Sequence, residues 1–139
     1  PSSISYTGNN RTHMIRIPDP GRFELRLMDG SVNPYLLQAG VLAAGIEGLN
    51  KKINPGKPLH CNMYEDSDKY PNLSKLPNEL GESLDKITNN KVINKAFGKN
   101  VIDSYVKLKK IELKEFNSKE KFDKSKPITK WERQNTLDC

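Results

Sequence analysis

The chain has 139 residues and a formal net charge of +6, from 23 basic and 17 acidic side chains. This length suits one ordinary domain, and no stretch approaches the roughly 20 consecutive apolar residues of a membrane-spanning helix. The two cysteines, Cys61 and Cys139, lie far from each other, and neither has a histidine at zinc-finger spacing. This favours free thiols in a reducing cytoplasm. His13 and His60 are too far apart in sequence to suggest a metal pair.

The segment from Arg11 to Pro34 predicts a β-hairpin. Apolar and charged residues alternate between Arg22 and Met28, and a strand sends successive side chains to opposite faces. The stretch from His13 to Ile17 is also strand-like, and the PDPG sequence that follows it has the composition of a turn. One face of the second strand is apolar and the other is charged, with Phe23, Leu25 and Leu27 on the first and Arg22, Glu24 and Arg26 on the second.

Arginine is concentrated in this segment. Four of the chain's five arginines lie in it, at positions 11, 16, 22 and 26, and it contains no lysine. A guanidinium group can grip a phosphate or a carboxylate bidentately, which an ammonium group cannot. The clustering therefore favours a face that binds anionic groups. The alternative is a solvated strand face with a ladder of Arg–Glu ion pairs, each worth about 0–1 kcal/mol.

Helical signals follow the hairpin. Asn33 and Pro34 predict the N-cap and first residue of a helix that runs to about Lys52, and its nearly uncharged sequence predicts burial on most sides. A long surface loop is expected from Asn54 to about Pro77. Thr129 and Glu132 have the spacing of a capping box, which predicts a last helix. Further helices are predicted at 84–88, 92–97 and 100–117, and a charged linker at 119–127.

Most of the excess positive charge lies between residues 99 and 130, which hold ten lysines and five acidic residues. A basic helical face is compatible with nucleic-acid binding. However, the lysines are interleaved with acids such as Glu112 and Glu115, and no stacking aromatics or recognised binding signature accompany them. A solvated helix face is therefore expected, and a nucleic-acid partner is not.

Two motifs in the hairpin segment are specific when taken together. The first is NR-x4-RIP, which begins at Asn10, and the second is R-x-E-x-R, which begins at Arg22. They resemble the C-terminal part of the catalytic domain of glutamine synthetases, over most of the chain from about residue 8. The other matching elements are Asp29, Asn33-Pro34-Tyr35-Leu36, the AAG-x-x-G helix from Ala43 to Gly48, Pro55-Gly56, Asn62-Met63-Tyr64, Leu76-Pro77, Ser83-Leu84 and Trp131-Glu132.

The resemblance implies roles for the residues of the two motifs. Arg11 and Arg16 match positions that contact the phosphates of ATP, and Glu24 matches a ligand of an active-site Mg²⁺ or Mn²⁺. Arg26 matches a residue that holds the glutamate substrate. Arg11 and Arg22 are implied as catalytic residues, Arg22 through electrostatic support. A carboxylate between two arginines should have a lowered pKa, so that it stays ionised for a cation.

The resemblance also implies the reaction. Glutamine synthetases use ATP to convert glutamate to γ-glutamyl phosphate, from which ammonia displaces phosphate. The implied setting is a cytoplasmic homo-oligomer built as stacked rings, and Tyr64 aligns with a loop tyrosine that some bacterial members adenylylate for regulation. Two alternatives are a γ-glutamyl ligase for another amine and a non-catalytic basic domain that binds a protein or nucleic acid.

The expected fold class is α+β, with an antiparallel hairpin that belongs to a larger sheet and four or five helices after it. The chain begins at Pro1 in a polar run without a signal peptide, so we expect an excised piece of something longer. Residues 1–139 would be the C-terminal portion of a glutamine synthetase-like catalytic domain, without the N-terminal domain and the first part of the catalytic domain. Such a piece should expose apolar surface and be inactive alone.

Overall fold

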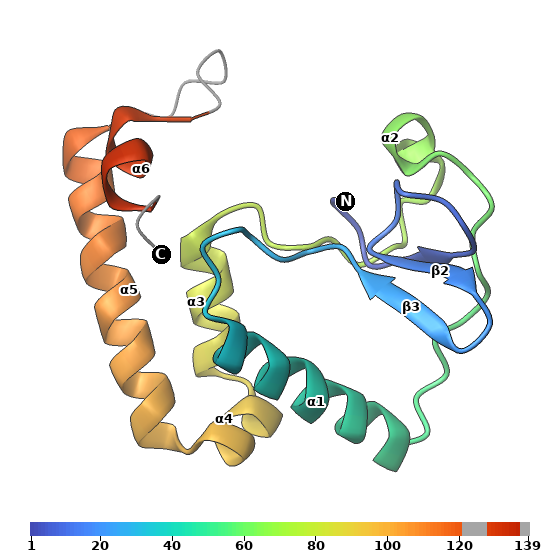
Figure 1. The fold of residues 1–139 in the computed structure, drawn as a ribbon, viewed down its shortest axis with the longest axis horizontal. Coiled ribbons are helices and arrows are strands. Elements are labelled where there is room, and N and C mark those ends of the chain that lie inside the picture. Colours follow the sequence, from blue (N-terminus) through green and yellow to red (C-terminus); the bar gives the residue numbers. More distant parts are fainter. Residues whose placement is uncertain (121–127, 137–139) are drawn as a thin grey trace. The chain divides into compact units, whose positions relative to one another are not determined.

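The computed structural model describes residues 1–120 and 128–136, which form two compact units. The first unit contains Pro1–Asp29 and Ile53–Asn78, and the second contains Gly30–Lys52 and the chain from Glu79 onward. The described residues contain three strands, six α-helices and one 3-10 helix (Figure 1). The α+β prediction is confirmed, with one strand, one short α-helix and one 3-10 helix more than the sequence suggested. None of the described helices is long and apolar enough to cross a membrane.

The sheet of the first unit is built around the predicted hairpin. Strand β2, Ile15–Asp19, pairs antiparallel with β3, Arg22–Leu25, across a turn in which Gly21 has a φ of +78°. This positive φ explains why a glycine stands there. The strands are shorter than predicted, because His13 and Met14 precede β2 and Arg26 to Met28 follow β3. The backbone N–H of Arg26 still donates to the carbonyl of Met14 at 2.9 Å.

Strand β1, Tyr6–Thr7, pairs parallel with β2 and has no counterpart among the predicted elements. It lies in the N-terminal polar run, and its segment is buried through short hydroxyl side chains instead of apolar ones. Ser3, Ser5 and Thr7 alternate along the chain with exposed fractions of 1, 9 and 2%. Their period of two is that of a strand, but the usual hydrophobic signal is absent.

The predicted loop after Asn54 contains two short helices, α2 at Met63–Asp66 and the 3-10 helix η1 at Ser67–Lys69. The side chain of Asn62 caps α2 by accepting from the N–H of Tyr64 at 3.1 Å. Backbone hydrogen bonds tie this segment to the N-terminus: Leu59 donates to Tyr6 at 3.0 Å and Ile4 donates to Ser74 at 2.8 Å. The long loop is therefore an integral part of the first unit, held to the N-terminal segment by backbone hydrogen bonds.

The second unit is a small helical assembly. Its helices are α1 (Pro34–Asn50), α3 (Leu80–Thr88), α4 (Lys91–Phe97), α5 (Lys99–Lys119) and α6 (Lys130–Asn135). The Asn33 cap is confirmed, since its side chain accepts from the N–H groups of Tyr35 and Leu36, and the capping box at Thr129 and Glu132 is confirmed too. The predicted linker lies almost wholly at 121–127, outside the described residues.

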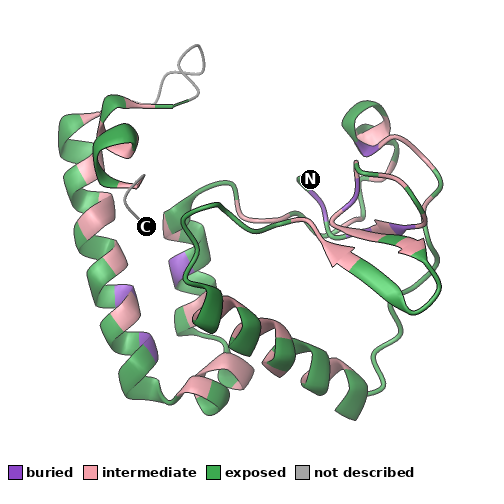
Figure 2. Ribbon diagram, in the orientation of Figure 1, coloured by how far each residue is buried: buried purple, intermediate pink, exposed green. Residues whose placement is uncertain are grey.

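The core of the second unit is small. Leu84, Ile102 and Val106 are buried, and Ile87, Ile93, Phe97 and Tyr105 pack against them. Helix α6 adds an edge-on contact between the rings of Trp131 and Phe116, with centroids 5.6 Å apart. Burial in this unit is concentrated on α3 and α5, as Figure 2 shows.

The prediction that the first helix is buried on most sides is wrong for this chain. No residue of α1 is buried, and within the unit α1 packs mainly on α4 (Figure 2). An apolar stripe, which consists of Tyr35, Leu42, Ile46 and Leu49, is exposed. These positions fall on one side of a helix with 3.6 residues per turn. The sequence is that of a buried helix, but the described residues offer it one main neighbour.

A pair of glycine substitutions should change the free energy of unfolding in opposite directions. Gly98 links α4 to α5 with a φ of +83°, so Gly98→Ala should cost about 1–3 kcal/mol. Gly45 lies within α1, and a Cβ there would meet nothing within 4 Å, so Gly45→Ala should stabilise by about 0.5–1 kcal/mol. Urea unfolding followed by circular dichroism measures both, and two changes of the same sign would contradict the argument.

Candidate functional site

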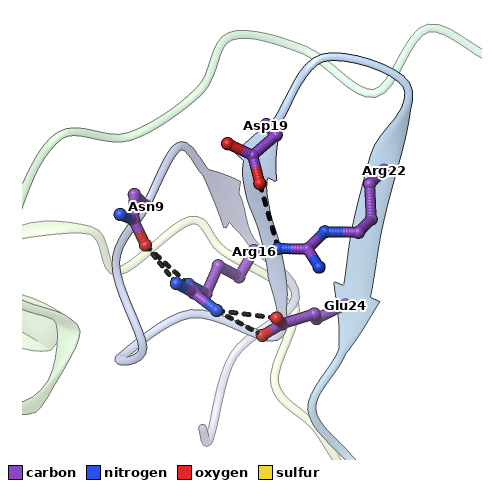
Figure 3. A network of polar contacts seen from close by, with 5 residues as sticks. All are labelled: Asn9, Arg16, Asp19, Arg22 and Glu24. Carbon is purple, nitrogen blue, oxygen red and sulfur yellow. Dashed lines mark hydrogen bonds and ion pairs between the residues drawn. The ribbon is translucent and has the colours of Figure 1, made fainter.

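The hairpin brings Arg16 and Glu24 together. Arg16 on β2 and Glu24 on β3 are register partners across the sheet. The Nη1 of Arg16 donates to both carboxylate oxygens of Glu24 at 2.7 Å (Figure 3). The Arg16 side chain is 12% exposed and that of Glu24 is 39% exposed, so the pair lies at the edge of the solvent with the arginine largely enclosed.

Asn9 holds the other side of the same guanidinium group. Its side-chain oxygen accepts from Nε of Arg16 at 2.9 Å and also from Nη2 (Figure 3). Arg16 is thereby fixed between two acceptors on different segments, and this leaves its planar group little rotational freedom. No role for Asn9 follows from the sequence alone, because only the fold shows that its side chain contacts Arg16.

The pKa of Glu24 is lowered from its ordinary value. The largest cause is the hydrogen bond from Arg16. Burial, the second largest cause, acts in the opposite direction, and the positive charges of Arg16, Arg22 and Arg11 lower the pKa further. The expected direction is confirmed, but the main cause is an arginine on the neighbouring strand and not the two that flank Glu24 in sequence. Glu24 is therefore an ionised carboxylate at neutral pH.

Arg22 lies on the same face but has a different partner. Its Nη2 donates to the Asp19 carboxylate at 3.0 Å across the end of the hairpin (Figure 3). Both side chains are more than half exposed, so this pair contributes little to stability. Arg22 acts on Glu24 through its charge alone.

Arg26 follows the last residue of β3, and one end of its side chain is enclosed. Its Nη1 is buried and has no hydrogen-bond partner among the residues that the structure describes. A buried donor without an acceptor costs about 1–3 kcal/mol, so such groups are uncommon unless a ligand or another chain satisfies them. This nitrogen is therefore a candidate donor to an acceptor that the described residues do not supply.

Arg11 and Tyr64 are exposed. Arg11 lies in the turn between β1 and β2, and its charge reaches Glu24. Tyr64 is the second residue of α2, and 67% of its surface is exposed. Every residue that the sequence analysis assigned to the site therefore belongs to the first unit. Arg11, Arg16 and Arg22 act on Glu24 through their positive charge, whereas Tyr64 lies on α2.

Comparison with known proteins identifies the family. A family model described as "Glutamine synthetase, catalytic domain" matches residues 1–134. The chain belongs to the glutamine synthetase catalytic-domain family. It is 44% identical over 138 residues to the glutamine synthetase of Rhizobium meliloti (strain 1021), which covers 99% of this chain and 30% of that protein. The chain thus spans about a third of the length of the curated relatives it matches.

The chain is also similar to a protein whose name gives methylamine as the amine. The glutamate–methylamine ligase of Methyloversatilis universalis is 42% identical over 119 residues, which is 84% of this chain and 26% of that protein. A solved structure titled as a complex of GmaS with ADP is 39% identical, with a TM-score of 0.81, and covers all of this chain and 30% of its own. The predicted resemblance is confirmed, as is the fold class.

The described residues do not complete a metal site. They contain no group of three or more histidine, cysteine, aspartate or glutamate side chains that could hold an ion. His13 is fully enclosed by protein, so it does not pair with His60. Cys61 is a free thiol, as predicted, while Cys139 lies outside the described residues. Glu24 is an ionised oxygen donor, the type that Mg²⁺ and Mn²⁺ prefer, so it fits one ligand of such an ion and no more.

Replacing Arg16 with alanine should raise the pKa of Glu24 toward its ordinary value, since Arg16 supplies the hydrogen bond and the largest attraction. In the native protein the lowered pKa contributes stability above the ordinary carboxylate pKa, and this contribution is lost as the pH falls through the lowered value. Titration of the Glu24 carboxyl carbon by NMR measures the change. Arg22→Ala is the matched control, and an equal or larger rise in that variant would contradict the assignment to Arg16.

Proposed function

We propose that the chain forms part of an ATP-dependent ligase that joins ammonia to glutamate through γ-glutamyl phosphate. Membership of the glutamine synthetase family supports the class of reaction. The observation that carries the proposal is the convergence of three arginines on the ionised Glu24 carboxylate. Two residues further along the chain, Arg26 has a buried Nη1 with no hydrogen-bond partner among the described residues. Phosphate, a cation and an amino-acid carboxylate are the chemical groups that such a surface can recognise together.

The first pair of arginines would bind the phosphates of ATP. Phosphoryl transfer depends on positioning and on neutralising the charge that develops on the phosphate oxygens. Arg16 is already fixed by Asn9 and Glu24, and Arg11 presents an exposed guanidinium group near the same carboxylate. Arg22 would add positive charge to this face without binding directly, as a supporting catalytic residue.

Glu24 would hold one coordination position of Mg²⁺ or Mn²⁺. Such an ion, when bound, neutralises charge on the transferred phosphate. Arg16 already engages both oxygens of Glu24, so a cation must compete with that guanidinium group. The remaining ligands would come from outside the described residues of this chain.

Arg26 would hold a carboxylate of glutamate through its buried Nη1, for which the described part of the chain supplies no acceptor. The exposed Tyr64 suits a regulatory modification, since its ring can be reached from solvent. The complete ligase would be a cytoplasmic homo-oligomer, built as stacked rings. A nucleic-acid partner is disfavoured, because Lys99, Lys109 and Lys119 on α5 are each paired with an acid of the same helix.

The second candidate is a ligase that joins glutamate to methylamine. It is favoured by the 42% identity to such an enzyme and by the likeness to the GmaS structure. The residues discussed above would grip phosphate, cation and amino acid, and none of them would touch the amine. The choice between the two candidates therefore depends on residues beyond this site.

The complete ligase, assayed for phosphate release with glutamate, MgATP and a panel of amines, tests the proposal. Ammonia-dependent release supports glutamine synthesis, and a preference for methylamine supports the second candidate. Phosphate release with none of the amines would refute both. The assay at several ion concentrations with Mg²⁺ and Mn²⁺ identifies the cation.

The 139-residue chain alone should have no ligase activity and should bind MgATP only weakly. It provides one carboxylate and the arginines, but the described residues do not form a complete cation site. A γ-glutamyl transferase assay and isothermal titration with MgATP measure the two properties. Robust turnover by the chain alone would show that the remaining ligands are not needed.

A further inference from the structure

The turn that carries Arg11 is joined to a segment about fifty residues away in sequence. Asn10 Nδ2 donates to the carbonyl oxygen of Cys61 at 2.9 Å, and Nε2 of His13 lies 3.0 Å from the same oxygen. The N–H of Met63 donates to the hydroxyl of Thr12 at 3.0 Å. Three hydrogen bonds on both sides of Arg11 thus connect the turn to the residues at the start of α2. We call this set of contacts the Arg11 clamp.

The carbonyl partner determines where the His13 ring carries a proton. A carbonyl oxygen only accepts, so Nε2 must be protonated whatever the charge of the ring. In the neutral ring Nδ1 is then an acceptor, and it faces the hydroxyl of Ser5 at 3.0 Å. His13 is 0% exposed, so neither nitrogen can exchange its partner for bulk water. The imidazole therefore links three segments of the first unit in one fixed orientation.

The other two members of the clamp hold each other in place. The side-chain oxygen of Asn10 accepts from the N–H and the hydroxyl of Thr12, both at 2.9 Å. The Thr12 hydroxyl donates its single proton there, which leaves its lone pairs for the N–H of Met63. The donors and acceptors form a consistent set, and rigid sets of this kind fix the geometry of a neighbouring functional group.

We propose that His13 is a positioning residue for the nucleotide, because it fixes the turn from which Arg11 reaches the phosphates. This rests on the proposed phosphate role of Arg11. The Arg11 side chain is exposed and lies in a turn, so the backbone on each side of it must be held by other contacts. Asn10 and His13 provide those contacts by donating to one carbonyl oxygen. The clamp lowers the freedom that Arg11 would lose on binding phosphate.

Two variants of the complete ligase separate this role from general stability. His13→Leu removes both ring contacts, whereas His13→Gln keeps an N–H donor that can reach the Cys61 carbonyl. His13→Leu should raise the KM for ATP at least about tenfold, because it removes the buried hydrogen bond to the Cys61 carbonyl next to Arg11. His13→Gln should recover most of this loss, and the KM for glutamate should stay unchanged in both. A fall in kcat with equal increases of both KM values, or a glutamine variant no better than leucine, would overturn the proposal.

Tyr6→Phe is the matched control. It removes another hydrogen bond between the N-terminal and loop segments of the same unit, from the Tyr6 hydroxyl to the Gly56 carbonyl at 2.8 Å, which is not part of the Arg11 clamp. This variant should keep the KM for ATP of the native enzyme. An increase equal to that of His13→Leu would mean that any loosening of the unit has the effect, and the specific role of His13 would be refuted.

The 139-residue chain provides a test that needs no activity. Long-range ¹⁵N–¹H NMR should find the proton of His13 on Nε2, and amide exchange of Met63 should be about tenfold faster in His13→Leu, while that of Arg26 stays unchanged. A ring protonated on Nδ1 alone would refute the clamp. If Arg11→Ala leaves the KM for ATP unchanged while the NMR results hold, the proposed role of Arg11 fails and the clamp stands as a structural contact only.

Discussion

Glu24→Gln should abolish the activity of the complete ligase, with a loss of at least about a hundredfold in kcat/KM. The amide has nearly the same shape as the carboxylate but lacks the charge that a divalent cation needs and that three arginines stabilise. The fold should persist, since the Glu24 side chain lies at the solvent edge and its main partner Arg16 keeps Asn9. Phosphate release at saturating MgATP, glutamate and ammonia measures the loss.

The control for Glu24→Gln is Asp19→Asn. It also removes a carboxylate that is paired with an arginine of the hairpin, but this pair is exposed at the turn. The variant should retain most of the activity. The same pair of variants examines the non-catalytic alternative, because binding of nucleic acid through the basic helices would survive Glu24→Gln and weaken steeply with salt. Full ligase activity in Glu24→Gln would remove the carboxylate from the site.

Arg26→Ala should raise the KM for glutamate at least about thirtyfold, because truncating one partner of a buried, hydrogen-bonded charge pair is costly. The free energy of unfolding should rise or stay unchanged, since the variant removes a buried donor that has no partner in the described part of the chain. Steady-state kinetics with varied glutamate and urea unfolding of the same preparation give the two quantities.

Arg133→Ala is the control for Arg26→Ala. Arg133 lies in α6 of the second unit, so its replacement subtracts one positive charge and leaves every residue of the first unit unchanged. The KM for glutamate should stay at the native value. If Arg26→Ala instead loses stability and keeps its KM, Arg26 is a structural residue whose acceptor is supplied by another part of the protein.

The parts of the fold that the sequence predicted are those that local chemistry determines. The alternation around Glu24 and the PDPG turn predicted the hairpin, because a period of two and a turn sequence act over a few residues. Asn33 and Thr129 predicted two helix starts in the same way, through side chains that satisfy nearby N–H groups. Each of these features depends on residues that are close together in the sequence.

The parts that it did not predict depend on contacts between distant segments. Arg16 as the main partner of Glu24 follows from the register of two strands, which neighbouring sequence does not reveal. The buried serines beside β1 carry no hydrophobic signal, and the contacts of His13 link it to residues 5 and 61. The exposure of α1 is the opposite case. Its sequence is apolar enough for a buried helix, but the described residues do not bury it.

The apolar stripe of α1 has a practical consequence for handling the protein. Sulfate and phosphate strengthen contacts between apolar surfaces, whereas added salt screens ion pairs such as that between Arg22 and Asp19. Precipitants rich in sulfate would therefore drive molecules of the isolated chain together through Leu42, Ile46 and Leu49 while loosening the charged face of the hairpin. Crystals or spectra of the native hairpin are better sought in buffers of low ionic strength.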